Sequence, residues 1–325
     1  MIKLTRSFIV IIFIFLIGCS PGELLSLASS FSTDTLQEYY DAKEYEQALE
    51  YVEEQLEQHP DDYVLLAEQG YLLMETGHPN EALDAINASL EIEDENEGAY
   101  NNKAWALIEL ERYEEAVDAA KIAIEMKPDE EEEFINMGNA LSGMYRDQEA
   151  LVYYEEALEI NPESTYALIG KGIAHYYLGE PEKALESLNV YLELIPEDVD
   201  ALWYVVYAHD DLGNLDEVLK YSEQMIRDYN DQDAYYYKAS VLEELEQWDE
   251  ALVAYDQLID QYPQDATAYY WKSRVLIQQD QVEDAFSVLE KSIEMDPSLR
   301  EWALEDEVFQ AFQDDKAFQN IIIGE

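Results

Sequence analysis

The chain contains very few basic residues. Its 325 residues include 18 Lys and Arg against 74 Asp and Glu, which gives a formal net charge of −56. Binding to a phosphate backbone requires a basic surface, so the composition excludes nucleic acid as a partner. The acids are spread over most of the chain. This distribution favours a solvated, self-repelling surface, and a dedicated acidic site is the alternative.

Cysteine and histidine are also scarce. Cys19 is the only cysteine, so no internal disulfide can form. Among the four histidines, His175 and His209 occupy equivalent places in the sequence pattern described below, with Asp210 and Asp211 next to the second. Two histidines and a carboxylate could bind a metal ion, but their place on an apolar stripe favours semi-buried packing residues. The sequence has no phosphate-binding loop, zinc-protease helix or nucleophile elbow. It therefore predicts no catalytic residue, no metal and no cofactor, and a protein that is not an enzyme.

Residues 1–20 contain no acid and differ from the rest of the chain. Lys3 and Arg6 precede an unbroken apolar run from residue 8 to residue 17. This run is too short for a stable membrane span but is typical of a signal peptide. It ends in the tetrapeptide Leu16-Ile17-Gly18-Cys19. The tetrapeptide resembles the bacterial lipobox, where lipoprotein signal peptides are cut before a cysteine that carries lipid.

This resemblance implies a lipoprotein signal peptide over residues 1–18, a lipid anchor such as palmitate on Cys19, and a tether over residues 19–33. Two or more acyl chains give stable anchoring. We then expect the protein in a bacterial cell envelope, at the outer face of the cytoplasmic membrane. Ser20 follows the cysteine in place of Asp, which permits the outer membrane in a cell with two membranes. An ordinary signal peptide or an uncleaved anchor is the alternative.

Residues 131–164 contain the clearest example of a repeated pattern. Two apolar stripes with helical spacing follow one another, formed by Phe134, Met137, Gly138 and Leu141, then by Ala150, Tyr154 and Ala157. Gly138 and Ala150 are small, so two antiparallel helices can cross closely there. Pro162 ends the second helix. The unit resembles a tetratricopeptide repeat, a 34-residue helix-turn-helix with small residues at positions 8 and 20 and proline at position 32.

The same columns recur along most of the chain. The small residue at position 20 returns as Ala48, Ala82, Ala116, Ala150, Ala184, Val218, Ala251 and Ala285. The resemblance implies an all-α, right-handed superhelical solenoid of about eight repeats over residues 29–299, closed by a C-terminal capping helix within residues 300–325. The predicted repeats are 29–62, 63–96, 97–130, 131–164, 165–198, 199–231, 232–265 and 266–299. The sixth has only 33 residues and carries Asn230 in place of proline, so we expect an altered junction with the seventh.

A second stripe on each first helix is expected to line a concave surface. It is formed by positions 2, 5, 9 and 12, with position 13 at the rim. The residues predicted to line this groove are Asn101, Trp105, Asn139, Tyr166, Tyr176, Trp203, Tyr207, Asp211, Tyr236 and Tyr270. Their rings could stack on the side chains of an extended segment and their amides could bond its backbone. A competing interpretation places several of these rings in the core.

The groove has few cations of its own. Members of the family that bind a C-terminal carboxylate use a clamp of basic residues, and the lysines of that clamp are absent here. Arg274 is the only basic residue of the predicted stripe. The sequence therefore predicts a protein or peptide partner of neutral to basic character.

These features together predict a membrane-anchored, extracytoplasmic scaffold or assembly factor that binds proteins or peptides. The alternative is a protein that binds a cell-envelope polysaccharide or peptidoglycan, with Tyr and Trp rings stacked on sugars.

Overall fold

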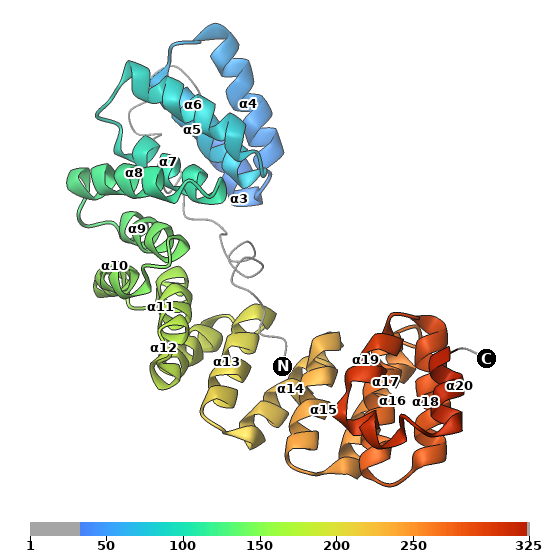
Figure 1. Cartoon of the computed structure of the whole chain (residues 1–325). Coiled ribbons are helices and arrows are strands. Elements are labelled where there is room, and N and C mark those ends of the chain that lie inside the picture. The colour runs from blue at the N-terminus through green and yellow to red at the C-terminus, as the bar shows by residue number, and fades with distance from the viewer. Residues whose placement is uncertain (1–32, 324–325) are drawn as a thin grey trace. The chain divides into compact units, whose positions relative to one another are not determined.

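The computed structural model describes residues 33–323, and all regular structure in this range is helical (Figure 1). The predicted signal peptide, the lipobox with Cys19, and the tether up to residue 32 lie outside the described residues. Within 33–323 no helix combines the length and the apolar character needed to cross a membrane.

The helices follow one another in pairs that pack against each other. In chain order the pairs are α3 (Thr33–Ala42) with α4 (Tyr45–Gln58), α5 (Tyr63–Glu75) with α6 (Pro79–Ile92), α7 (Glu97–Glu109) with α8 (Tyr113–Met126), α9 (Glu131–Gly143) with α10 (Asp147–Ile160), α11 (Thr165–Tyr177) with α12 (Pro181–Leu194), α13 (Val199–Asp211) with α14 (Leu215–Tyr229), α15 (Gln232–Glu244) with α16 (Trp248–Gln261), and α17 (Ala266–Gln278) with α18 (Val282–Met295). The all-α solenoid of helical hairpins expected from the sequence is confirmed.

The C-terminal segment differs from the single capping helix that the sequence predicted. It forms three short helices, α19 (Leu299–Glu305), the 3-10 helix η2 (Glu307–Phe312) and α20 (Lys316–Ile323). Asp306 and Asp315 cause the breaks, because their carboxylates accept hydrogen bonds from the backbone N–H groups of Val308 and Ala317 at 3.0 and 2.7 Å. A carboxylate in this place caps the following helix instead of continuing the preceding one.

The small residue at position 8 makes room for a larger side chain on the second helix of the same repeat. A Cβ added to Gly138 would lie 2.6 Å from the ring of Tyr154, and one added to Gly172 would lie 2.7 Å from Leu188. Tyr154 and Leu188 are buried. Close approach of the paired helices therefore depends on these glycines, as their positions in the repeat predicted.

The turn between the two helices of each repeat places position 15 in the left-handed region of backbone conformation. Three repeats have glycine there, and φ is +79° at Gly77, +72° at Gly179 and +69° at Gly213. The other five have a residue with a side chain: Lys43, Glu111, Tyr145, Glu246 and Asp280, with φ between +56° and +61°. The turn geometry is thus shared by all eight repeats whether or not glycine is present.

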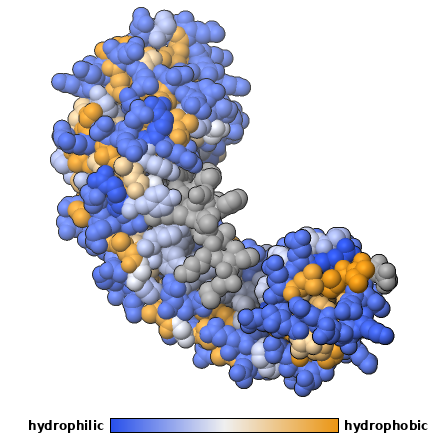
Figure 2. Space-filling model, in the orientation of Figure 1, coloured by the Kyte–Doolittle hydropathy of each residue, from blue (hydrophilic) through white to orange (hydrophobic). Residues whose placement is uncertain are grey.

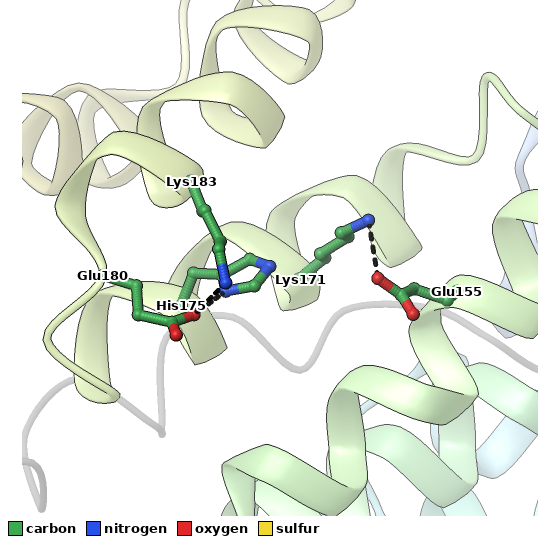
Figure 3. A network of polar contacts seen from close by, with 5 residues as sticks. All are labelled: Glu155, Lys171, His175, Glu180 and Lys183. Carbon is green, nitrogen blue, oxygen red and sulfur yellow. Dashed lines mark hydrogen bonds and ion pairs between the residues drawn. The ribbon is translucent and has the colours of Figure 1, made fainter.

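Consecutive repeats are joined by polar contacts between position 7 and position 25 of the preceding repeat. Lys171 Nζ lies 3.1 Å from Glu155 Oε1 (Figure 3), and Lys238 Nζ lies 2.9 Å from Glu223 Oε1. Lys272 pairs with Asp256 in the same way, and Gln69 Nε2 donates to Glu53 Oε1 at 3.5 Å. Each pair connects a second helix to the first helix of the next repeat.

The helices form two compact units, of which the first ends at Glu197 and the second begins at Asp198. The sequence predicted one uninterrupted array. The division falls at the start of the sixth repeat, which the sequence identified as irregular, and not at its junction with the seventh, where the sequence predicted the change. At that later junction Asn230 ends α14 with φ +51°, and its carbonyl accepts a hydrogen bond from the Tyr262 hydroxyl at 2.6 Å.

Candidate functional site

Asn101 was predicted to lie in the groove of the first unit, but it is buried between first helices. Asn136 Nδ2 of α9 donates to Asn101 Oδ1 of α7 at 2.7 Å, and both side chains are buried. A hydrogen bond between two amides in the interior fixes the register of neighbouring repeats. The prediction that Asn101 is exposed to a ligand was therefore wrong.

Trp105 is also buried, because its ring belongs to a series of aromatic contacts that runs from one first helix to the next. Its ring centroid lies 6.2 Å from that of Tyr71 on α5, which in turn lies 6.0 Å from that of Tyr40 on α3. Such tilted and edge contacts stabilise packing beyond the area that they bury. The predicted exposure of Trp105 was wrong, and the competing interpretation, that some rings of the stripe belong to the core, holds at this position.

Asn139 is half-buried and is held by its own repeat. Its Oδ1 accepts a hydrogen bond from the hydroxyl of Tyr154 at 2.8 Å. The ring of Tyr154 fills the space that Gly138 and Gly170 leave, since a Cβ on Gly170 would lie 2.5 Å from it. The side chain of Asn139 therefore has a fixed direction.

Tyr166 and Tyr176 are half-buried on α11. Burial raises the pKa of Tyr166, and the carboxylate of Glu75 and the phenol of Tyr45 raise it further. Tyr176 forms an edge contact with Tyr177, with ring centroids 5.5 Å apart.

Three aromatic side chains of the second unit form a cluster, which we call the aromatic triad: Trp203, Tyr207 and Tyr237. Trp203 stacks on Tyr207 with ring centroids 5.4 Å apart and an interplanar angle of 25°. Tyr237 of α15 meets both rings edge-on, at 5.6 and 5.9 Å. All three are half-buried. The Tyr237 hydroxyl donates to Asp210 Oδ2 at 2.7 Å, so a carboxylate lies directly beside the rings.

Carboxylates also surround Tyr236 and the starts of the first helices in the second unit. The Tyr236 hydroxyl donates to Asp265 Oδ2 at 2.5 Å, and burial followed by this carboxylate raises the pKa of Tyr236. Burial and neighbouring acids likewise raise the pKa of Asp200 and of Asp233. Asp211 is exposed, as predicted for the rim. The second unit therefore presents half-buried rings among acids that repel one another.

Tyr270 is buried by the C-terminal segment and does not line a groove. Its hydroxyl donates to Asp306 Oδ2 at 2.7 Å, and its ring centroid lies 5.7 Å from that of Trp302 and 6.1 Å from that of Phe309. Arg274 Nε lies 2.6 Å from the same Asp306 oxygen, without the alignment of a linear hydrogen bond. The predicted role of Tyr270 in the groove was wrong, because the capping segment covers its stripe.

The two histidines considered as metal ligands each contact a residue at the start of the second helix of their own repeat. His175 Nδ1 lies 2.7 Å from Glu180 Oε2, which also accepts from Lys183 Nζ at 3.1 Å (Figure 3). His209 Nδ1 lies 3.4 Å from Asn214 Nδ2, and its ring stacks on Tyr221. No group of three or more potential ligands among residues 33–323 is placed to hold a metal ion.

Several carboxyl groups inside the first unit have raised pKa values. Burial raises the pKa of Glu68 to about 8 and that of Glu109 to about 7. Burial and a hydrogen bond with Glu97 raise the pKa of Glu133. The formal charge of −56 therefore overstates the charge of the folded chain near neutral pH.

Sequence reasoning missed Tyr237, which belongs to the triad, and named its neighbour Tyr236, which does not. Tyr237 lies at position 6 of its repeat, outside positions 2, 5, 9 and 12 that were predicted to line the groove. The run Tyr235-Tyr236-Tyr237 was the available signal, because three successive rings on a helix cannot all face one side.

Comparison with known proteins agrees with this architecture. Residues 28–241 match a family model described as coatomer epsilon subunit, and residues 236–299 match one described as tetratricopeptide repeat. The chain therefore belongs to the family described as coatomer epsilon subunit, and with the match of its C-terminal repeats it is a tetratricopeptide repeat protein. No curated protein matches the chain.

Several solved structures share the fold. PilW, described as a widely conserved type IV pilus biogenesis factor, is similar with a TM-score of 0.56 and 18% identity, over 61% of this chain and 91% of that one. PilF of Pseudomonas aeruginosa has a TM-score of 0.53 and 21% identity, over 61% and 90%. A tetratricopeptide repeat protein of Parabacteroides merdae has a TM-score of 0.51 and 17% identity, over 70% and 90%.

Proposed function

We propose that this chain is a lipid-anchored scaffold or assembly factor of a bacterial cell envelope, attached through Cys19, and that it binds protein or peptide segments of neutral to basic character. It acts by binding and not by catalysis. The observation that carries the proposal is the aromatic triad of the second unit with the carboxylate of Asp210 beside it. The lipid anchor and the location rest on the lipobox.

The triad suits a cationic side chain of a partner. The face of an aromatic ring attracts a cation, by about 0.5–2 kcal/mol depending on how far the pair is desolvated. Asp210 and the exposed Asp211 add opposite charge at the same place. A lysine or arginine side chain lying on the rings would meet both kinds of attraction, whereas a carboxylate would be repelled.

Preformed geometry supports tight recognition at this place. The stacked Trp203 and Tyr207 and the hydrogen bond from Tyr237 fix the rings before any ligand arrives, so little side-chain entropy is lost on binding. PilW, which shares the fold, is described as a pilus biogenesis factor, and an assembly role of this general kind is what we propose here.

Photo-crosslinking in native membranes tests the proposal. A photoreactive residue is placed at Trp203, with a control at Gln257, which is exposed on α16. The expected result is a discrete protein adduct from position 203 and none from position 257. Equal labelling from both positions would contradict the proposal.

Two further results would change the proposed function. Transfer of the label from position 203 into cell-wall glycan would assign the rings to a polysaccharide, which is the alternative function. If Trp203→Ala leaves the affinity of the purified chain for a lysine-rich extended peptide unchanged, the triad is not part of the binding site. Loss of the Trp203 ring should weaken this binding about tenfold.

A further inference from the structure

The second helices of the first unit carry exposed apolar residues at two recurring positions. Six of the eight residues at positions 26 and 30 of the predicted repeats two to five form an outer stripe: Ile92, Ile122, Met126, Ile160, Val190 and Leu194. The other two are Ala88 and the exposed Glu156. Five of the six stripe residues are exposed, with fractions of 47% for Ile92, 37% for Ile122, 41% for Ile160, 42% for Val190 and 40% for Leu194. Orange patches interrupt the blue surface on the side where α8 and α10 lie (Figure 2).

The stripe is confined to these four repeats. The same two positions elsewhere hold Glu54 and Gln58, Gln224 and Asp228, Gln257 and Gln261, and Lys291 and Met295. Single exposed apolar residues are ordinary, but a contiguous exposed patch marks a contact surface. Stacked repeats present equivalent positions on the same side, so the residues of the outer stripe share one side of the first unit, with Glu156 among them.

Rows of exposed carboxylates border the outer stripe. Position 29, one turn after position 26, holds Glu91, Glu125, Glu159 and Glu193. Position 33, in the loop that follows the last helical residue at position 30, holds Glu95, Asp129, Glu163 and Glu197. Lys121 and Lys127 also lie beside the stripe, and Lys127 Nζ is 3.4 Å from Glu97. The surface thus combines an apolar line with negative flanks.

We infer that the outer stripe is a second docking surface, separate from the first-helix stripe, and that its occupant is an amphipathic helix of another protein with Lys or Arg on both sides of its apolar face. Charge complementarity selects this occupant. A second copy of this chain would place carboxylates against carboxylates, and an anionic membrane surface would be repelled in the same way.

The dimensions agree with a helical occupant. Four second helices at roughly 10 Å per repeat span about 30 Å, the length of a helix of about 20 residues. An amphipathic helix presents apolar residues every three or four positions and laterally flanking charges, which matches an apolar line bordered by acids.

Titration with three peptides of about 20 residues tests the inference on the full chain. The first combines Leu at helical spacing with Lys elsewhere, the second replaces its Lys by Glu, and the third has the composition of the first with Leu and Lys rearranged so that no apolar face forms. The expected result is that the first peptide binds at least tenfold more tightly than the third, that the second does not bind, and that added salt weakens binding. Binding of the third as tightly as the first would overturn the inference, because charge alone would then explain it.

Glutamine substitutions locate the surface. The variant Ile92→Gln, Ile122→Gln, Ile160→Gln and Val190→Gln introduces the residue that the seventh repeat itself has at positions 26 and 30. It should bind the first peptide at least tenfold more weakly, while the control Gln224→Ala with Gln257→Ala, at position 26 of the sixth and seventh repeats, should bind it as the unchanged chain does. Loss of binding in Trp203→Ala alone would overturn the inference and leave the proposed function standing.

A second variant keeps the test valid if the first does not fold. Replacing Glu91, Glu125, Glu159 and Glu193 by Gln leaves the apolar line intact and should weaken binding and its dependence on salt. If the full chain self-associates as its concentration rises and the Ile and Val substitutions abolish this, the occupant of the outer stripe is a second copy of the chain. That result would overturn the inference.

Discussion

Replacing Glu111 and Glu246 by glycine is expected to stabilise the chain. Both residues occupy the turn between paired helices with φ of +57° and +56°, in the region that side chains with a Cβ disfavour. The left-handed conformation costs about 1–2 kcal/mol for a residue other than glycine. Glycine loses about 0.5–1 kcal/mol more chain entropy on folding, so the net gain is about 0.5–1 kcal/mol at each site.

The matched control is the reverse substitution at an equivalent turn. A Cβ added to Gly179 would meet nothing within 4 Å, so Gly179→Ala isolates the backbone cost without a steric one. It should destabilise the chain by a similar amount. Glu111→Gln and Glu246→Gln, which remove the charge but keep the side chain, separate the backbone effect from relief of charge repulsion.

Thermal unfolding of the chain from Ser20 onward, followed by circular dichroism, measures these differences. Each glycine substitution should raise Tm by about 1–4 °C above that of the corresponding glutamine variant. A Tm equal to or below that of the glutamine variant, together with no effect of Gly179→Ala, would refute the conformational argument.

Three further predictions concern the core, a buried acid and the anchor. Ala150→Leu should overpack the fully buried position 20 of the fourth repeat and cost about 1–3 kcal/mol, seen as a lower urea midpoint; an unchanged midpoint would contradict the packing. Burial raises the pKa of Glu68 from 4.5 to about 8, so between these values the unfolded chain releases a proton that the folded chain keeps, and stability falls as the pH rises. Glu68→Gln should therefore stabilise the chain more at pH 8 than at pH 5, and an equal effect at both would refute this. Cys19→Ser should release the protein from membranes into the soluble fraction on sedimentation, and retention in the pellet would contradict lipidation as the only anchor.

The recurrent columns of small residues predicted the helical hairpins correctly because they reflect contacts within one repeat. Gly138 and Tyr154 meet inside a single unit of the pattern, so their spacing alone is sufficient to predict the contact. The capping segment was predicted as one helix, although Asp314-Asp315 interrupts its apolar series. Its division into three helices depends on which acids accept backbone hydrogen bonds, and Asp306 has no distinctive spacing that would have revealed the first break.

The groove was predicted less well because burial on the second stripe depends on the next repeat. Asn101, Trp203, Tyr236 and Tyr270 all occupy position 5, yet Asn101 and Tyr270 are buried while Trp203 and Tyr236 are half-buried. Asn101 meets the amide of Asn136, and Tyr270 is covered by the C-terminal segment. Neither neighbour follows from the position within the repeat.

The positions of the few Lys and Arg side chains in the structure add to the argument about which partners the chain prefers. Lys171, Lys238 and Lys272 each pair with an acid of the preceding repeat, and Arg274 pairs with Asp306 of the C-terminal segment. These cations therefore neutralise acids at junctions inside the solenoid. The aromatic triad and the outer stripe, in contrast, are bordered mainly by carboxylates. We therefore propose the same preference for basic partners at both surfaces, with a different shape of ligand at each: single cationic side chains on the rings, and a basic amphipathic helix along the stripe.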